Sequence, residues 1–345
     1  MNRIKLSYPV FTLTFAYLLS GNVIMNPVYL IKNPLVVYIL TSAVLLVYSN
    51  IILSYFIKRK SINNTKYAKL VASALFLLVI FPMTSVVFNY TKGLGIFSDY
   101  YATAFVVIFA SVACIGCSVY GAYKGKGCTV NFSYLVYPIM ALWIVLGIFA
   151  FLHTKNAVPL KEGLGGIIEI DFREFLKCVG YVCFDLTLLM TVLTDNVKDS
   201  KKRSFKSSVN AAVLLYIVIT GIGLVKNLLL FGEDFLQRME NPELTSISLV
   251  PLFEFPEISL IINTFACVMK MCVYACAVFF IVRDAFGKGL NFVRAALVMS
   301  LSVVALFLGI YFFKVSNQYV NIFSLIALIM CSVLNFAFFS KREEK

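Results

Sequence analysis

The apolar residues of this chain fall into long runs, each about the length needed to cross a lipid bilayer, and this feature limits the possible folds most. Five runs occupy the first half of the chain and five the second, at positions 8–31, 35–57, 68–91, 102–122, 132–153, 173–194, 208–231, 258–282, 290–313 and 318–340. A helix crosses a hydrocarbon core about 30 Å thick with roughly 20 residues. Because 61% of the 345 residues are apolar, the connections leave no room for a sizeable domain outside the membrane. The runs predict an all-α integral membrane protein with ten transmembrane helices.

The basic residues lie mainly in the short connections between the runs and indicate the orientation of the chain. Lys and Arg accumulate on the cytoplasmic side of short loops. With the amino terminus inside, ten crossings place most of the 30 basic residues on that side, including Lys58, Arg59, Lys60 and Lys341. This distribution predicts a multi-pass membrane protein with both termini cytoplasmic. The net charge of +13 then reflects topology, so we expect contact with the lipid bilayer and no nucleic-acid partner.

Two runs contain residues that favour an interrupted helix. Ser20, Gly21 and Asn22 lie near the middle of the first run, with Pro27 beyond them, and Gly180 lies near the middle of the sixth. Helices that line a membrane binding site are often broken at mid-depth, where freed backbone groups face a cavity. The pattern therefore predicts breaks in helices 1 and 6. Alternatively, each glycine only permits close packing of helices.

The equivalent positions of these two points suggest an internal repeat. Breaks in the first helix of each half are typical of inverted repeats, in which two five-helix units cross the membrane in opposite directions. We therefore expect a single membrane domain, 1–345, made of a first repeat at 1–153 and a second at 154–345.

Two ionisable residues, Asp185 and Lys270, lie at the same depth near the centres of the sixth and eighth runs. Charges at mid-membrane cost about 2.5 to 3.5 kcal/mol each on insertion scales and are usually functional. In the eighth run Asn263, Cys267, Lys270 and Tyr274 repeat at helical spacing, which predicts one inward-facing stripe. The two opposite charges either form a purely structural ion pair or also line a ligand or proton site.

The sharper alternative is a site for a zwitterionic ligand. Its carboxylate would lie near Lys270 or the amides around Gly21, and its amine near Asp185 or the carbonyls around Gly180. The predicted ligand-binding residues are Gly21, Asn22, Gly180, Asp185, Asn263, Lys270 and Tyr274.

A further lysine, Lys226, lies within the seventh run, about one turn from its outer end. Long basic side chains near helix ends extend their charge toward the membrane interface. We therefore expect Lys226 to reach the interface and to take no part in the central site.

The sequence argues against catalysis. His153 is the only histidine, and neither a phosphate-binding loop nor a cluster with metal-ligand spacing occurs. Cys114 and Cys117 have CxxC spacing, but they lie within an apolar run without flanking ligands, which favours a packing role. We predict no enzyme activity, no cofactor and no metal site.

Several modest motifs along most of the chain carry a family resemblance. These are Ile4 to Ser7, Gly21 and Pro27 near the start, Tyr120 to Gly125, then Asn156, Pro159 and Gly163, Phe184-Asp185, Phe231-Gly232, and Glu254, Phe255 and Pro256. Together they make the chain resemble the endospore germination permease family, the B subunit of Ger-type nutrient germinant receptors, within the amino acid/polyamine/organocation transporter superfamily. The chain departs from the family pattern at Val10 and at Asn33-Pro34-Leu35.

The resemblance implies a LeuT-like fold with a small nutrient, such as an amino acid, bound where helices 1, 3, 6 and 8 meet. It also implies residence in the spore inner membrane with an A-type membrane subunit and a C-type lipoprotein subunit. The first functional hypothesis is thus a nutrient-germinant sensor on a transporter scaffold. The alternatives are a proton- or sodium-coupled amino acid secondary transporter and a passive scaffold with a degenerate pocket.

Overall fold

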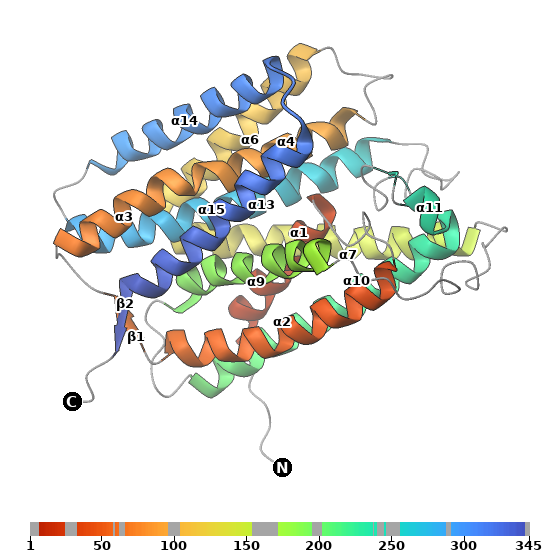
Figure 1. The fold of residues 1–345 in the computed structure, drawn as a ribbon, viewed down its shortest axis with the longest axis horizontal. Coiled ribbons are helices and arrows are strands. Elements are labelled where there is room, and N and C mark those ends of the chain that lie inside the picture. Colours follow the sequence, from red (N-terminus) through yellow and green to blue (C-terminus); the bar gives the residue numbers. More distant parts are fainter. Residues whose placement is uncertain are drawn as a thin grey trace.

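The computed structural model describes residues 7–24, 33–57, 59–61, 66–95, 104–153, 172–194, 202–236, 238–239, 245, 256–287 and 291–341. Its helices are α1 (Tyr8–Ile24), α2 (Pro34–Ile57), α3 (Lys66–Leu78), α4 (Ile80–Gly95), α6 (Ala104–Lys124), α7 (Lys126–His153), α9 (Phe172–Thr194), α10 (Lys202–Phe231), α11 (Glu233–Leu236), α13 (Pro256–Phe286), α14 (Phe292–Phe312) and α15 (Asn317–Phe338). Two short strands, β1 (Arg59–Ser61) and β2 (Phe339–Lys341), complete the described elements. The long helices lie side by side as one bundle (Figure 1).

The helices follow the ten apolar runs, so the predicted fold class is confirmed. Among the described residues, nine helical segments are long and apolar enough to cross a membrane, and the shorter apolar helix α1 matches the first run. The third run corresponds to α3 and α4 together. Local hydrophobicity alone was enough for this result, because a helix in lipid needs an unbroken apolar surface of defined length.

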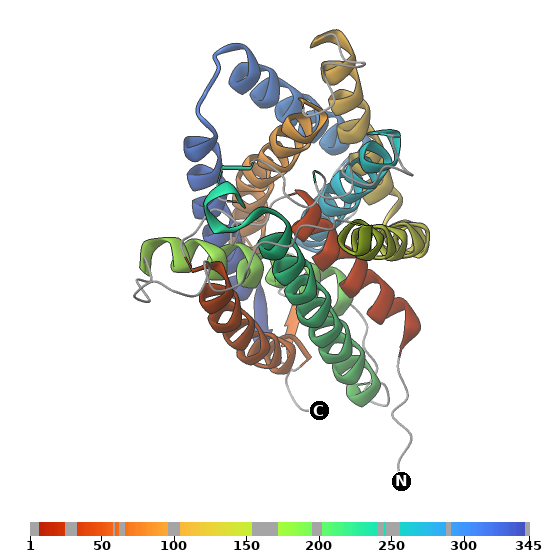
Figure 2. The ribbon, with the colours of Figure 1, turned by 90° about the vertical axis from the view of Figure 1, so that its right-hand side faces the viewer.

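The helix α13 forms the centre of the bundle. It is 31 residues long and packs against α1, α3, α4, α6, α7 and α9. Of its apolar stretch 83% is buried inside the protein, whereas only 17% of that of α14 is. Figure 2 shows α14 at the edge of the bundle. Residues on every side of α13 therefore face protein, including the predicted stripe.

The breaks predicted in helices 1 and 6 are not at the expected positions. The α1 helix continues through Ser20, Gly21 and Asn22 to Ile24, and residues 25–32 lie outside the described part of the chain. The α9 helix is continuous from Phe172 to Thr194 and includes Gly180. Glycine permits an interruption but does not force one, and a helix in lipid gains by keeping its backbone hydrogen bonds.

An interruption that the sequence analysis missed lies in the third span, between α3 and α4. Val79 is in a turn, and Pro82 follows three residues later. Because proline has no amide hydrogen, Pro82 cannot donate to the carbonyl of Leu78, and its ring crowds that carbonyl. The interruption is local, because the Val79 amide still donates to the carbonyl of Leu75 at 3.0 Å and the Met83 amide to that of Val79 at 3.1 Å.

Two connections tie helices together tightly. Gly125 alone separates α6 from α7, and its φ of +95° is one that L side chains rarely adopt. On the side of the bundle where α2 ends, β1 pairs with β2 in antiparallel register, with Arg59 opposite Lys341. This pair joins the α2–α3 connection to the end of α15.

Candidate functional site: a buried ion pair between α9 and α13

The central charges meet as the sequence predicted. The Nζ atom of Lys270, on α13, forms an ion pair with Oδ2 of Asp185, on α9. The two residues are only 7% and 4% exposed. An isolated charge at this depth would be strongly destabilising, so each residue is tolerated because the other neutralises it.

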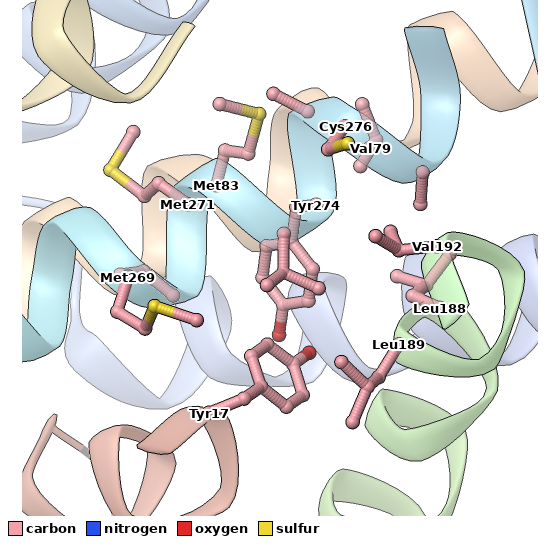
Figure 3. Packing of buried hydrophobic residues seen from close by; sticks show 14 of the residues in the cluster. Tyr17, Val79, Met83, Leu188, Leu189, Val192, Met269, Met271, Tyr274 and Cys276 are labelled. Carbon is pink, nitrogen blue, oxygen red and sulfur yellow. The ribbon is translucent and has the colours of Figure 1, made fainter. Parts of the chain in front are cut away.

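Two tyrosines complete the surroundings of the carboxylate. The hydroxyl of Tyr274 donates to Oδ1 of Asp185 at 2.6 Å, and the hydroxyl of Tyr17, on α1, donates to the same oxygen. Figure 3 shows both hydroxyl groups pointing toward each other between α1 and α13. The Lys270 ammonium also lies 4.3 Å from the centre of the Tyr17 ring, a favourable cation–π geometry. Side chains from α1 and α13 therefore hold the carboxylate of Asp185, on α9, in place.

Gly21 belongs to this site because it leaves space. A Cβ atom at this position would lie 2.6 Å from Nζ of Lys270 and 3.9 Å from Oδ2 of Asp185. Glycine lets the ammonium lie against the α1 backbone while it reaches the carboxylate, whereas a side chain at this position would force the lysine end to shift. The sequence analysis also placed Gly21 at the site, but for a different reason. It expected a helix break at Gly21, and α1 is continuous there.

A small cavity adjoins the ion pair. Its volume is about 50 Å³, and α1, α4, α9, α10, α13 and α15 all contribute to its wall. A water molecule in liquid takes about 30 Å³, whereas small-molecule pockets begin at roughly 300 Å³. In this conformation the cavity therefore has room for water but not for an amino acid.

Polar groups of the wall come from residues that the sequence analysis did not select. They are Ser85 on α4, Tyr181 on α9, Tyr216 on α10 and Ser324 on α15. Tyr17 was also missed, although it lies one turn before Gly21 on the same helix. The four-residue spacing places Tyr17 and Gly21 on the same face of α1, and this was the signal available in the sequence. The sequence does not show which neighbouring helix that face contacts.

The remaining predicted residues divide into two groups. Asn22 and Tyr274 line the cavity beside the ion pair. Gly180 does not, because a Cβ atom there would lie 2.7 Å from Cδ1 of Leu325, which shows close packing of α9 on α15. Asn263 is buried about two turns from Lys270, where its Nδ2 donates to the carbonyl of Tyr90 at 3.3 Å.

The site carries two groups of opposite charge. Within the described ranges, no group of three or more His, Cys, Asp or Glu side chains could hold a metal ion. The carboxylate can accept hydrogen bonds and the ammonium can donate them. The arrangement can therefore bind a cation, an anion or a molecule that carries both charges.

Comparison with known proteins identifies the fold. No protein-family model matches the sequence, and neither does any curated protein. The chain is similar to the solved structure of Mhp1, a nucleobase-cation-symport-1 family transporter, in a closed conformation with bromovinylhydantoin bound. The TM-score is 0.56 at 14% sequence identity, and the match covers 96% of this chain and 80% of Mhp1. At this identity the likeness shows the fold alone, and the chain therefore has the LeuT-like transporter fold that the resemblance implied.

Proposed function

We propose that this protein binds a small zwitterionic solute, such as an amino acid, at the Asp185–Lys270 pair. The main support for this proposal is that two opposite charges meet beside a cavity near the centre of a transporter fold. The solute's ammonium group replaces Lys270 as the partner of Asp185, and its carboxylate replaces Asp185 as the partner of Lys270. Each buried charge keeps an opposite partner throughout, which limits the cost of burial.

Binding in this way requires the ion pair to open. The cavity of about 50 Å³ cannot accept an amino acid while Lys270 contacts Asp185. A ligand that fits only after α9 and α13 separate shifts the protein toward that more open state. Gly21, Asn22 and Tyr274 line the same cavity and stay in the proposed site, whereas Gly180 and Asn263 stabilise the surrounding helix packing.

We assign this binding step to a nutrient-germinant sensor. Support comes from motifs that resemble those of germination permeases, including Phe184-Asp185 at the ion pair itself, where the family usually has a glycine and a glutamate, so that the carboxylate is kept but shortened. In this proposal the chain lies in the spore inner membrane with both termini cytoplasmic. Its two five-helix repeats, 1–153 and 154–345, pass the change of state to an A-type membrane subunit and a C-type lipoprotein subunit.

The second candidate is a proton- or sodium-coupled amino acid transporter. The fold of Mhp1, a transporter, favours it. Both functions use the same site and differ only in whether the solute crosses the membrane. Counterflow of radiolabelled amino acids in proteoliposomes separates them, because robust exchange by the purified chain alone indicates transport and its absence, with ligand binding retained, indicates sensing.

The binding site is tested with a panel of amino acids and the purified protein in detergent. We expect at least one amino acid to raise the thermal unfolding temperature, and we expect Asp185→Asn and Lys270→Met to abolish that shift. Lys314→Met is the matched control, because Lys314 is exposed and far along the chain from both charges. Unchanged ligand binding in both folded variants would contradict the assignment, and a panel with no active member would favour a passive scaffold.

A further inference from the structure

One hydroxyl group in the wall of the central cavity is left without a partner. Tyr216, on α10, lines this cavity with the ion pair and is only 9% exposed. Its backbone carbonyl accepts a hydrogen bond from Thr220, but within the described part of the chain its side-chain hydroxyl has no hydrogen-bond partner. A buried hydroxyl without a partner is destabilising unless water or a ligand supplies one.

The other wall hydroxyls that do not contact the ion pair already have partners. Oγ of Ser85 donates to Oδ1 of Asn321 at 3.2 Å. The hydroxyl of Tyr181 donates to the backbone carbonyl of Asn321 and also forms a side-chain hydrogen bond with Ser324. In this set, the hydroxyl of Tyr216 is therefore the one that is available to a bound molecule.

The charges of the wall restrict the side chain that a zwitterionic solute can carry. Of the described residues that line the cavity, only Asp185 and Lys270 are charged. In the proposed function both are already occupied by the ammonium and carboxylate groups of the solute. A charged side chain on the solute would be buried without an opposite partner, which is costly, so a neutral side chain is favoured.

We propose that Tyr216 selects solutes whose neutral side chain can form a hydrogen bond, as in serine, threonine, asparagine and glutamine. This inference rests on the proposed function, because it assigns a further polar contact within the same site. A phenol hydroxyl can both donate and accept, so hydroxyl and amide side chains are both suitable partners. A bound solute excludes water from the cavity, and an apolar side chain then leaves the Tyr216 hydroxyl unpaired. Sites built around a hydrogen bond reject an analogue that lacks it for this reason.

Threonine and valine test the proposal, because they have nearly the same shape and differ by a hydroxyl in place of a methyl group. Asparagine and leucine form a second pair of similar shape. Dissociation constants are measured by isothermal titration calorimetry with the purified full chain in detergent. We expect the wild type to bind the polar member of each pair about tenfold more tightly, the effect of one buried hydrogen bond. Tyr216→Phe should reduce this ratio to about one, and Tyr319→Phe, at a 61% exposed tyrosine, should leave it unchanged.

The outcomes separate this inference from the proposed function. Equal affinity of the wild type for both members of each pair would overturn selection by Tyr216 but leave the zwitterion site intact, and this measurement needs no variant. A ratio that survives Tyr216→Phe, or an equal loss of affinity for both members of a pair, would also overturn it, because the hydroxyl would then not contact the solute side chain. Binding restricted to amino acids with charged side chains would overturn it too. Binding of no amino acid at all would overturn the proposed function together with this inference.

Discussion

Lys270 and Lys226 are similarly buried, but different groups surround their ammonium ends. Lys270, 7% exposed, forms an ion pair with Asp185 of a neighbouring helix in the middle of the bundle. Lys226, 8% exposed, lies between α7 and α10 beside an apolar groove that opens to lipid. Burial by itself therefore does not define the role of a membrane lysine. The Asp185 carboxylate beside Lys270 is the basis for the proposed zwitterion site, and Lys226 adjoins no such described carboxylate in the wall of its groove.

The largest effect should come from removal of the charge that balances Lys270. Asp185→Asn leaves an uncompensated buried ammonium, and we expect a loss of about 3 to 5 kcal/mol in the free energy of unfolding. The double variant Asp185→Asn with Lys270→Met removes both charges and should recover at least half of that loss. Chemical unfolding in detergent, followed by circular dichroism, measures both values. A single variant as stable as the wild type would show that the pair contributes no electrostatic stabilisation.

A smaller effect should follow from loss of one hydrogen bond to the carboxylate. Tyr274→Phe removes the hydroxyl that donates to Asp185 at 2.6 Å while the ring remains. Hydrogen bonds to charged groups contribute about 1.5 to 3 kcal/mol, and we expect a loss near the lower limit because Tyr17 still donates to the same oxygen. The same unfolding measurement applies. Tyr319→Phe, at a 61% exposed tyrosine, should leave stability unchanged.

The space at Gly21 provides a steric test of the same site. Gly21→Ala places a methyl group 2.6 Å from Nζ of Lys270, so the ammonium must move away from Asp185. Overpacking of this kind costs about 1 to 3 kcal/mol, partly relieved here because the lysine end can shift. Gly116→Ala, which meets nothing within 4 Å, is the control. Equal unfolding free energies for the two variants would mean that the ion pair does not require close approach to α1.

The smallest effect should occur at the peripheral lysine. Lys226→Met should lower the free energy of unfolding less than Asp185→Asn does, because Lys226 lies near the end of α10 beside a groove lined by half-exposed side chains, away from the packed centre of the bundle. A loss as large as that of Asp185→Asn would remove the contrast between the two lysines.

The sequence was informative where structure depends on local properties. The ten runs predicted the spans because the length of an apolar segment decides whether it can cross the bilayer. The coincident depths of Asp185 and Lys270 were also readable, because depth follows from position within a run. The helix break expected at Gly180 is absent, since a glycine is equally compatible with a break and with close packing, here against Leu325. The turn at Val79 was missed although Pro82 was visible in the sequence.

By itself, the sequence determined that this chain is a ten-span membrane protein with two opposite charges at mid-depth. Only the tertiary structure decided that Tyr17 and Tyr274 share one oxygen of Asp185, that Gly21 makes room for Lys270, and that Lys226 adjoins a groove. The physical reason is that hydrophobic length places residues along the membrane normal. Their lateral neighbours depend on how each helix rotates and packs, and small differences in side-chain shape across many contacts decide that arrangement.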